Sequence, residues 1–288
     1  MSPMNNRLLV PRKTPGLLDL VPGAAAAYSL RSLSNSYADP VVTVRRSSDD
    51  AEEDFTASEV ADGTLAAFAG AGNAFVKQWW DQSGNEHHLG NTVSAEQPSI
   101  VSSGSVVTSE GKPAMRFDGT DDSMTLLAGS ASIPASQYLA SLFAVQQQDG
   151  TPSPATGNAT VFANSFNGTN NRMYAGIGTA YTTGRIGARF GSVTPVNTSG
   201  VGAVGGDQFL VSAVVNDTQA TLRVNGATAY DAPHTASGTG ITGLTIIVGG
   251  EAAGGYLDGR QQELIVYLAD LTEQRELVEG LIAWGYSV

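Results

Sequence analysis

Two groups of carboxylates lie in glycine-containing turns, where they could do chemistry. Glu251 follows two consecutive glycines, and Asp118, Asp121 and Asp122 lie around Gly119. A carboxyl group at a strand end can donate a proton to a glycosidic bond, and hard oxygen ligands spaced like the three aspartates can hold calcium. Both groups also have plainer interpretations, which we favour. Glu251 could be an exposed strand-end carboxylate, and aspartates stabilise turns through their side chains alone.

Two adjacent tryptophans end an apolar stretch at residues 75–80. Successive side chains of a strand point to opposite faces, so one of Trp79 and Trp80 should enter the core while the other could be exposed. An exposed indole ring can stack on a sugar, although aromatic residues in sandwiches mainly fill the core. The candidate glycan-binding residues are therefore Trp79, Trp80 and Glu251. The polar turn at 81–85 is explained by side-chain hydrogen bonds to the backbone.

Several other chemistries lack the residues that they need. The chain has no cysteine, which excludes a disulfide, a thiolate ligand and a cysteine nucleophile. His87 and His88 are adjacent and His234 is distant, which is not the spacing of a metal site. Neither a phosphate-binding loop nor a Gly-x-Ser-x-Gly motif is present. We expect no cofactor other than calcium at the aspartates.

The charge and hydropathy of the chain limit its partners. A net charge of -12 argues against nucleic acid, because affinity for the phosphate backbone comes from clustered lysine and arginine. No segment approaches the ~20 apolar residues that cross a bilayer, and residues 1–13 lack the apolar stretch of a secretory signal. We therefore expect neither nucleic acid nor a membrane as a partner.

Short β-type segments recur at intervals of roughly ten residues, which is typical of an all-β sandwich. The hairpin signal is strongest at Asn225-Gly226, because a type I′ turn needs a positive φ at both central positions. The acidic run at 49–54 is interpreted as a solvated loop. The predicted strands span residues 41–46, 75–80, 99–101, 114–117, 124–127, 139–146, 160–163, 172–177, 185–190, 209–215, 220–224, 244–248 and 262–267.

Two helical segments interrupt the strands, a short one at 64–68 and a longer one at the C-terminus. Asp270 can cap the second helix together with Glu273, and Leu277, Leu281 and Trp284 fall on one face. This helix should cover one edge or end of the sandwich.

The first 22 residues contain four prolines, which excludes a long helix or a central strand. We interpret residues 1–22 as an extended arm and residues 23–288 as one domain. The apolar residues of the arm would pack on a partner or back onto the sandwich. The residues that would anchor the arm to a neighbouring subunit are Arg7, Leu8, Leu9, Val10, Arg12 and Lys13.

Three stretches resemble known families: Tyr28-Ser-Leu-Arg with 44–49, Trp80-Asp-Gln-Ser-Gly-Asn with His88, and Phe117-Asp-Gly-Thr-Asp. The first two resemble the catalytic domain of α-L-arabinofuranosidase B. The third, with 248–251 and 255–259, resembles laminin-G-like and concanavalin A-like modules. Similar sequences occur in tailed-bacteriophage virion proteins, which begin with a comparable arm. The resemblance implies a concanavalin A-like jelly-roll β-sandwich with an extended N-terminal arm and a short C-terminal helix.

The resemblance also allows a test of glycosidase activity, which requires two carboxylates that flank the scissile bond. In the arabinofuranosidase family the acid lies in a Gly-Gly-Asp segment, which Glu251 matches. The nucleophile is a glutamate on an earlier strand, and residues 150–206, where we expect that strand, contain no Asp or Glu. We therefore predict that the chain is not an enzyme.

The function that we predict from the sequence is a non-enzymatic bacteriophage structural protein at the virion surface, either a head decoration or a tail or fibre component. Its partners would be capsid or tail subunits, further copies of itself and a host-surface glycan. Two alternatives stay open: a free carbohydrate-binding module and an arabinofuranosidase-like glycoside hydrolase. The second alternative needs a nucleophile outside residues 150–206.

Overall fold

The computed structural model describes residues 14–128, 139–149, 158–160, 172–178, 185–191, 196–202, 207–216, 218–233, 246–251 and 255–286. For residues from 158 to 202, and for 251, 255 and 284, only the backbone is described. The anchoring residues Arg7, Leu8, Leu9, Val10, Arg12 and Lys13 lie outside these ranges, as do the predicted strand residues 161–163 and 244–245.

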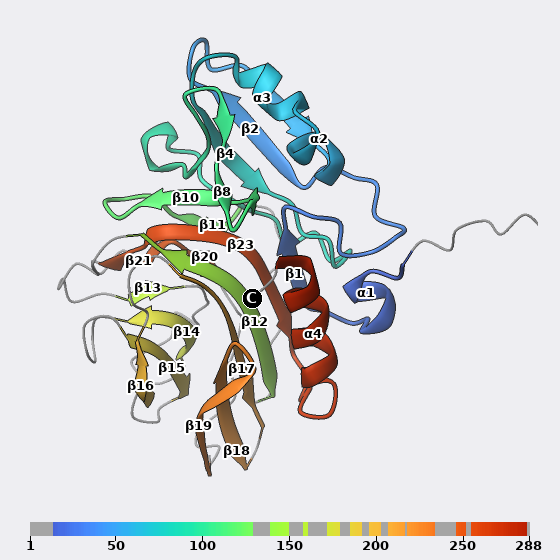
Figure 1. Ribbon diagram of the computed structural model, residues 1–288, viewed down its shortest axis with the longest axis vertical. Coiled ribbons are helices and arrows are strands. Elements are labelled where there is room, and N and C mark those ends of the chain that lie inside the picture. Colours follow the sequence, from blue (N-terminus) through green and yellow to red (C-terminus); the bar gives the residue numbers. More distant parts are fainter. Residues whose placement is uncertain are drawn as a thin grey trace, which may run out of the picture.

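Antiparallel strands make up most of the described chain (Figure 1). The helical elements are α1 (Leu17–Leu20), α2 (Ala57–Ala61), α3 (Thr64–Ala69), the 3-10 turn η1 (Ser94–Glu96) and α4 (Arg275–Tyr286). The strands are β1 (Ala26–Ser29), β2 (Val42–Arg46), β3 (Glu52–Phe55), β4 (Ala74–Trp79), β5 (Leu89–Gly90), β6 (Ser99–Ser102), β7 (Ser105–Val106), β8 (Thr108–Ser109), β9 (Lys112–Pro113), β10 (Met115–Asp118), β11 (Met124–Leu126), β12 (Ala140–Gln148), β13 (Asn158–Thr160), β14 (Arg172–Gly178), β15 (Arg185–Gly191), β16 (Val196–Gly202), β17 (Gln208–Val215), β18 (Gln219–Val224), β19 (Ala227–Pro233), β20 (Ile247–Val248), β21 (Gly250–Glu251), β22 (Gly255–Tyr256) and β23 (Asp258–Tyr267).

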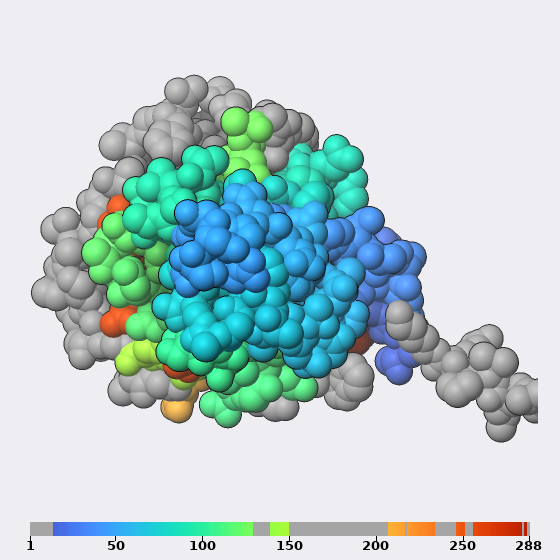
Figure 2. Space-filling model, turned by 90° about the horizontal axis from the view of Figure 1, so that it is seen from above, coloured from blue at the N-terminus to red at the C-terminus, as the bar shows by residue number. Residues whose placement is uncertain are grey.

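One large sheet organises the molecule, with the strand order β19-β18-β17-β12-β23-β10-β6-β4-β5-β11-β20. β13 to β16 form a separate four-stranded sheet, and β1 adds to β23 beside α4 (Figure 1). The N-terminal third, from β2 to β6 with α2 and α3, builds one end of the molecule, and its blue and cyan atoms cover that end in Figure 2. The predicted all-β sandwich with a short C-terminal helix is confirmed.

The central strands β12 and β23 are buried on both faces. Leu142 and Leu264 enter the larger core between the sheets, whereas Phe143, Ile265 and Tyr267 enter a second core beneath α1 and α4. Alternation along a strand sends neighbouring side chains into different cores, so both cores require apolar residues. This explains the apolar runs at residues 142–145 of β12 and 264–267 of β23.

The hairpin predicted at Asn225-Gly226 is confirmed. Asn225 has a φ of 48° and Gly226 a φ of 76°, and β18 pairs with β19 across this turn. The Asn225 side chain also accepts a hydrogen bond from the Leu210 backbone, at 2.7 Å, which ties the turn to β17. Both the positive φ of the turn and the hydrogen bond to β17 therefore favour asparagine at position 225.

The C-terminal helix begins at Arg275, five residues after the predicted cap, and its buried face differs in part from the predicted one. Asp270 accepts a hydrogen bond from Thr272 within the preceding turn. Val278 and Ile282 are fully buried, while Leu277, which we expected to face the sandwich, is 47% exposed. Of the predicted face, Leu277 is therefore wrong, whereas Leu281 packs against the core beneath α1 and α4, and the side chain of Trp284 lies outside the described residues. Arg275 determines the rotation of the helix, because its guanidinium binds Ser212 on β17.

The part of the arm that the structure describes packs back onto the sandwich. α1 begins at Leu17, which is 1% exposed, and Val21 accepts a hydrogen bond from the buried Tyr267 hydroxyl at 2.7 Å. Residues 17–22 therefore belong to the folded body, which corrects the extended conformation that we expected there. Among the described helices, none is long and apolar enough to span a bilayer.

The acidic run is exposed, as predicted, but part of it is a strand. Glu52 to Phe55 form β3, which pairs with β2, and three of its four residues are exposed. Glu52 forms an ion pair with Lys77 on β4 at 2.6 Å, so an opposite charge lies beside an edge strand that its composition disfavours.

Candidate functional site

The candidate site lies at the end of the sandwich where β21 approaches the turn after β10. A side chain at Gly249 would overlap the ring of Phe117, and its Cβ would lie 2.8 Å from the carbonyl oxygen of Asp122. Gly249 has a φ of +92°, so both its backbone and its surroundings require glycine. Glu251, on β21, is two positions along the chain from Gly249, the residue that contacts the aspartate turn. β21 pairs with β22.

The three predicted aspartates come together in this turn. One carboxylate oxygen from each of Asp118, Asp121 and Asp122 lies within 4.8 Å of the others. The turn also satisfies these groups internally. Asp118 accepts a hydrogen bond from the Thr120 backbone at 2.8 Å, and Asp122 accepts one from the Asp118 backbone at 2.9 Å. Turn stabilisation therefore accounts for the spacing, and calcium binding stays a prediction.

Asp122 has the unusual electrostatic environment in this turn. Its side chain is buried, whereas Asp118 is exposed. Burial, followed by repulsion from Asp118, raises the pKa of Asp122 from 3.8 to about 7. A carboxyl group that keeps its proton near neutral pH can serve as an acid, and two carboxyl groups in unequal environments are the usual arrangement of acid–base catalysis.

One face of β12 changes from apolar to polar toward the end of the strand. Gln146 and Gln148 continue the face of β12 that carries Leu142 and Ala144, and Gln146 pairs across the ladder with Gln261 on β23. These three amides are at most 3% exposed. Within the part of the chain that the structure describes, Gln146 has no hydrogen-bond partner at either amide atom, and the other two each have an unpartnered oxygen.

Unpartnered buried amides cost stability, so their presence requires an explanation. They are linked to Gly249 through two neighbouring strands: Gln148 pairs with Gly259 on β23, Gly259 pairs with Phe117 on β10, and Phe117 packs on Gly249. Their unpartnered atoms are shielded from solvent, so they belong to the interior of the sandwich and not to a ligand-binding surface. No sequence pattern singled out these glutamines, because their burial depends on the fold.

The two tryptophans separate as the alternation predicts. Trp79 is fully buried against Tyr28, with ring centroids 5.4 Å apart, and therefore is not available to a ligand. Trp80 is half-buried and lines a surface pocket of about 480 Å³. The prediction that one tryptophan fills the core and the other reaches the surface agrees with this arrangement.

The pocket beside Trp80 and the aspartate turn are at different ends of β23. Asp81, in the pocket wall, binds the backbone of Ala27, which pairs with Ile265, whereas Asp118 pairs with Asp258. The seven positions between these two places on β23 correspond to roughly 20 Å. The candidate glycan-binding residues Trp80 and Glu251 therefore are not brought together.

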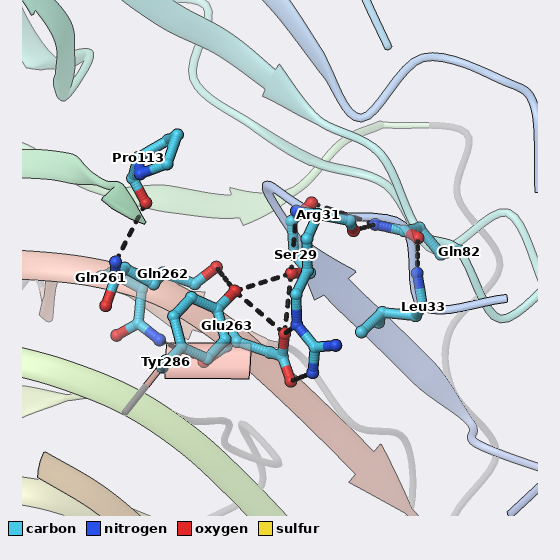
Figure 3. A network of polar contacts seen from close by, with 9 residues as sticks. All are labelled: Ser29, Arg31, Leu33, Gln82, Pro113, Gln261, Gln262, Glu263 and Tyr286. Carbon is cyan, nitrogen blue, oxygen red and sulfur yellow. Dashed lines mark hydrogen bonds and ion pairs between the residues drawn. The ribbon is translucent and has the colours of Figure 1, made fainter. Parts of the chain in front are cut away.

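A buried ion pair was missed in the sequence. Glu263, on β23, is fully buried and accepts hydrogen bonds from Arg31, Ser29 and the Tyr286 hydroxyl, as Figure 3 shows. The network joins β23 to β1 and to the end of α4, and Arg31 lies over the Tyr286 ring. The groups that donate hydrogen bonds to the Glu263 carboxylate all belong to the protein, so we assign this ion pair a structural role.

A family model described as "Alpha-L-arabinofuranosidase B, catalytic" matches residues 19–116. A solved GH54 α-L-arabinofuranosidase, soaked with 4-nitrophenyl α-L-arabinofuranoside, is similar with a TM-score of 0.69 at 16% identity, over 90% of this chain and 62% of that one. This chain has the arabinofuranosidase B catalytic fold. It spans 62% of the length of that relative.

Two other solved structures extend the comparison. An arabinofuranosidase complexed with arabinofuranosyl-α-1,2-xylobiose is similar with a TM-score of 0.65 at 16% identity, with the same coverage of 90% and 62%. Trypanosoma rangeli sialidase is similar with a TM-score of 0.51 at 12% identity, over 73% of this chain and 31% of that one. No curated protein matches the chain.

These comparisons contradict the prediction that the chain is not an enzyme, because the matching family model describes a catalytic domain of a glycosidase and similar structures are arabinofuranosidases. The prediction was based on the lack of Asp and Glu in residues 150–206. The fold, however, places a second group of carboxylates, the Asp118 turn, beside β21. The bacteriophage context has no support among these matches.

Proposed function

We propose that the chain is an arabinofuranosidase-like glycoside hydrolase whose reaction takes place where β21 meets the aspartate turn. The observation that carries the proposal is the close packing of Gly249 on Phe117 and Asp122, which positions Glu251 and the turn at one end of the sandwich. The match of the family model to residues 19–116 and the shared fold support the same reaction class.

The reaction needs a proton donor and a second carboxylate that acts as nucleophile or base. Glu251 matches the position of the donor in the resemblance. Asp118 is the candidate for the second group because it is exposed, whereas Asp122 is buried and a pKa of about 7 keeps it protonated below neutral pH.

The test is hydrolysis of 4-nitrophenyl α-L-arabinofuranoside by the full chain and by Glu251→Gln and Asp118→Asn. Removal of a general acid typically costs 10²- to 10⁴-fold in rate, and we expect losses of at least about 100-fold from each variant. Glu53→Gln is the matched control, because Glu53 is exposed on β3, which is separated from β10 in the sheet by β6, β4 and β2. Full activity of Glu251→Gln, or no hydrolysis of any arabinofuranoside by the unmodified chain, would overturn the proposal.

The predicted virion-surface location, the capsid or tail partners and the homo-oligomer stay predictions from the sequence. Because α1 is packed into the body, the segment to delete is residues 1–13 rather than 1–22. A deletion that leaves the thermal unfolding transition unchanged but prevents incorporation into particles would support an anchoring role. Normal incorporation would contradict it.

A further inference from the structure

The pocket beside Trp80 combines an aromatic ring with polar groups at one end of β4. Three segments form its walls: the turn after α1, the loop before β2 and the turn after β4. Tyr37 and His88 add two further rings, and Asp39 and Glu86 are exposed carboxylates at the pocket. An aromatic surface with a few polar groups in a concave site is the usual composition of a small-ligand pocket.

The Trp80 ring is held in place before any ligand binds. Its Nε1 donates a hydrogen bond to the Thr43 hydroxyl at 3.0 Å, and its ring lies 4.6 Å from the His88 ring, between centroids, at a tilt of 57°. Desolvation lowers the pKa of His88, so its imidazole is neutral near pH 7 and adds no positive charge. A ring that is already ordered loses little conformational entropy when a ligand stacks on it.

The pocket wall beneath Trp80 is rigid as well. The Asp81 carboxylate accepts backbone hydrogen bonds from Ala27 at 2.8 Å, Ser83 at 2.9 Å and His87 at 3.1 Å. Gln82 accepts a hydrogen bond from Leu33 and donates to the backbone of β1. The side chains of Asp81 and Gln82 are therefore occupied by hydrogen bonds within the protein. Ligand recognition is left to Trp80, to Tyr37 and to the exposed carboxylates Asp39 and Glu86.

The charges at the pocket select the ligand. Among its described lining residues there are acidic groups but no lysine or arginine. Carboxylates accept hydrogen bonds from sugar hydroxyl groups, whereas they repel uronic acids, sialic acids and phosphorylated or sulfated sugars. A fixed indole face with acceptors at its rim therefore fits an uncharged sugar.

We propose that the Trp80 pocket is a second carbohydrate-binding site, which holds an uncharged sugar of an oligosaccharide through stacking on Trp80 and hydrogen bonds to Asp39 and Glu86. It goes beyond the proposed hydrolase reaction and does not depend on it, because the pocket lies roughly 20 Å along β23 from the aspartate turn. In a polysaccharide-cleaving enzyme, such a site raises the effective concentration of the polymer at the reaction site.

The experiment measures binding of neutral arabinoxylan oligosaccharides to the full chain by isothermal titration calorimetry. We expect Trp80→Ala to weaken binding by about tenfold or more, because it removes the aromatic contact, and Trp80→Phe to lose only a few-fold. Tyr230→Ala is the matched control, since Tyr230 is a half-buried aromatic residue on β19, outside the pocket lining.

A second pair of variants covers the case in which Trp80→Ala fails to fold. Asp39→Asn and Glu86→Gln change only exposed groups and should each weaken binding by about threefold to tenfold, with unchanged thermal unfolding. The proposal is overturned if the unmodified chain binds no neutral oligosaccharide at millimolar concentration, or if these variants bind the oligosaccharide as tightly as the unmodified chain. Aromatic rings with carboxylates can also bind a quaternary ammonium cation, so tighter binding of tetramethylammonium than of sugar would overturn it as well.

Two further readouts separate this proposal from the proposed reaction. Glu251→Gln should keep oligosaccharide binding at the pocket while it loses hydrolysis. Trp80→Ala should keep its rate on 4-nitrophenyl α-L-arabinofuranoside but lose activity on soluble arabinoxylan. Equal losses on the small and the polymeric substrate would contradict a separate site.

Discussion

The substitution Glu263→Gln tests the buried network that joins β1, β23 and α4 (Figure 3). The carboxylate accepts hydrogen bonds from Ser29 at 2.7 Å, from Arg31 at 2.9 and 3.0 Å, and from Tyr286 at 3.0 Å. Glutamine has almost the same shape, but its amide NH₂ would face donors and the guanidinium would lose its counter-charge. The change therefore removes the counter-charge and one acceptor atom while it keeps the volume of the side chain.

The expected loss can be estimated from the exposure of the two partners. Removal of one member of a fully buried ion pair costs about 3–5 kcal/mol, because the other charge stays buried without a partner. Glu263 is fully buried, but the Arg31 side chain is 26% exposed and can partly regain hydration. We therefore expect Glu263→Gln to lower the free energy of unfolding by about 3 kcal/mol, the lower end of that range.

The assay is urea unfolding followed by circular dichroism. Lys77→Met, which breaks the exposed ion pair with Glu52, is the control and should cost no more than about 1 kcal/mol. The double variant Arg31→Met with Glu263→Leu removes both charges and should be within about 1 kcal/mol of the unmodified chain. A loss below about 1 kcal/mol for Glu263→Gln, or a double variant less stable than the single one, would refute the reasoning.

Three further substitutions test the end of the sandwich at β21. Gln146→Leu should raise the free energy of unfolding by about 1–2 kcal/mol in urea, because it removes an unpartnered buried amide; a loss of stability would mean that the amide has a partner. Asp122→Asn should remove a pH dependence of stability. Burial raises the pKa of Asp122 in the folded chain to about 7, so its stabilising contribution is complete below the unfolded value of 3.8 and is lost as the pH rises through about 7. The urea midpoint of the unmodified chain should therefore decrease between about pH 4 and pH 8, and that of Asp122→Asn should change less over the same range. Gly249→Ala should lower the free energy of unfolding by more than about 2 kcal/mol and impair hydrolysis, because the added methyl group would overlap Phe117. Unchanged unfolding and activity would show that neither stability nor catalysis requires the close approach of β21 to the aspartate turn.

Features that depend on neighbouring residues were predictable. The hairpin at Asn225-Gly226 and the short helix at 64–69 follow from backbone preferences. The separation of Trp79 from Trp80 follows from alternation along a strand, which holds wherever the strand lies. The same alternation could not tell which tryptophan enters the core, because that depends on the sheet face that the rest of the chain covers.

Features that depend on distant residues were not predictable. The buried face of α4 is chosen by the contact of Arg275 with Ser212, 63 positions away along the chain. Glu263 and Arg31, separated by 232 positions, form an ion pair only because β1 lies beside β23 and α4 covers both. Nothing in the local pattern distinguishes Glu263 from an exposed glutamate.

The same distinction between local and distant residues applies to the candidate site. The residue types, Glu251 after two glycines and three aspartates in a turn, are evident in the chain and limit the chemistry to proton transfer, hydrogen bonding and oxygen coordination. Which of them meet is decided by the packing of Gly249 on Phe117, and this packing also separates Glu251 from Trp80. Side-chain chemistry is a property of each residue, whereas proximity, burial and a raised pKa arise from segments that only the folded chain brings together.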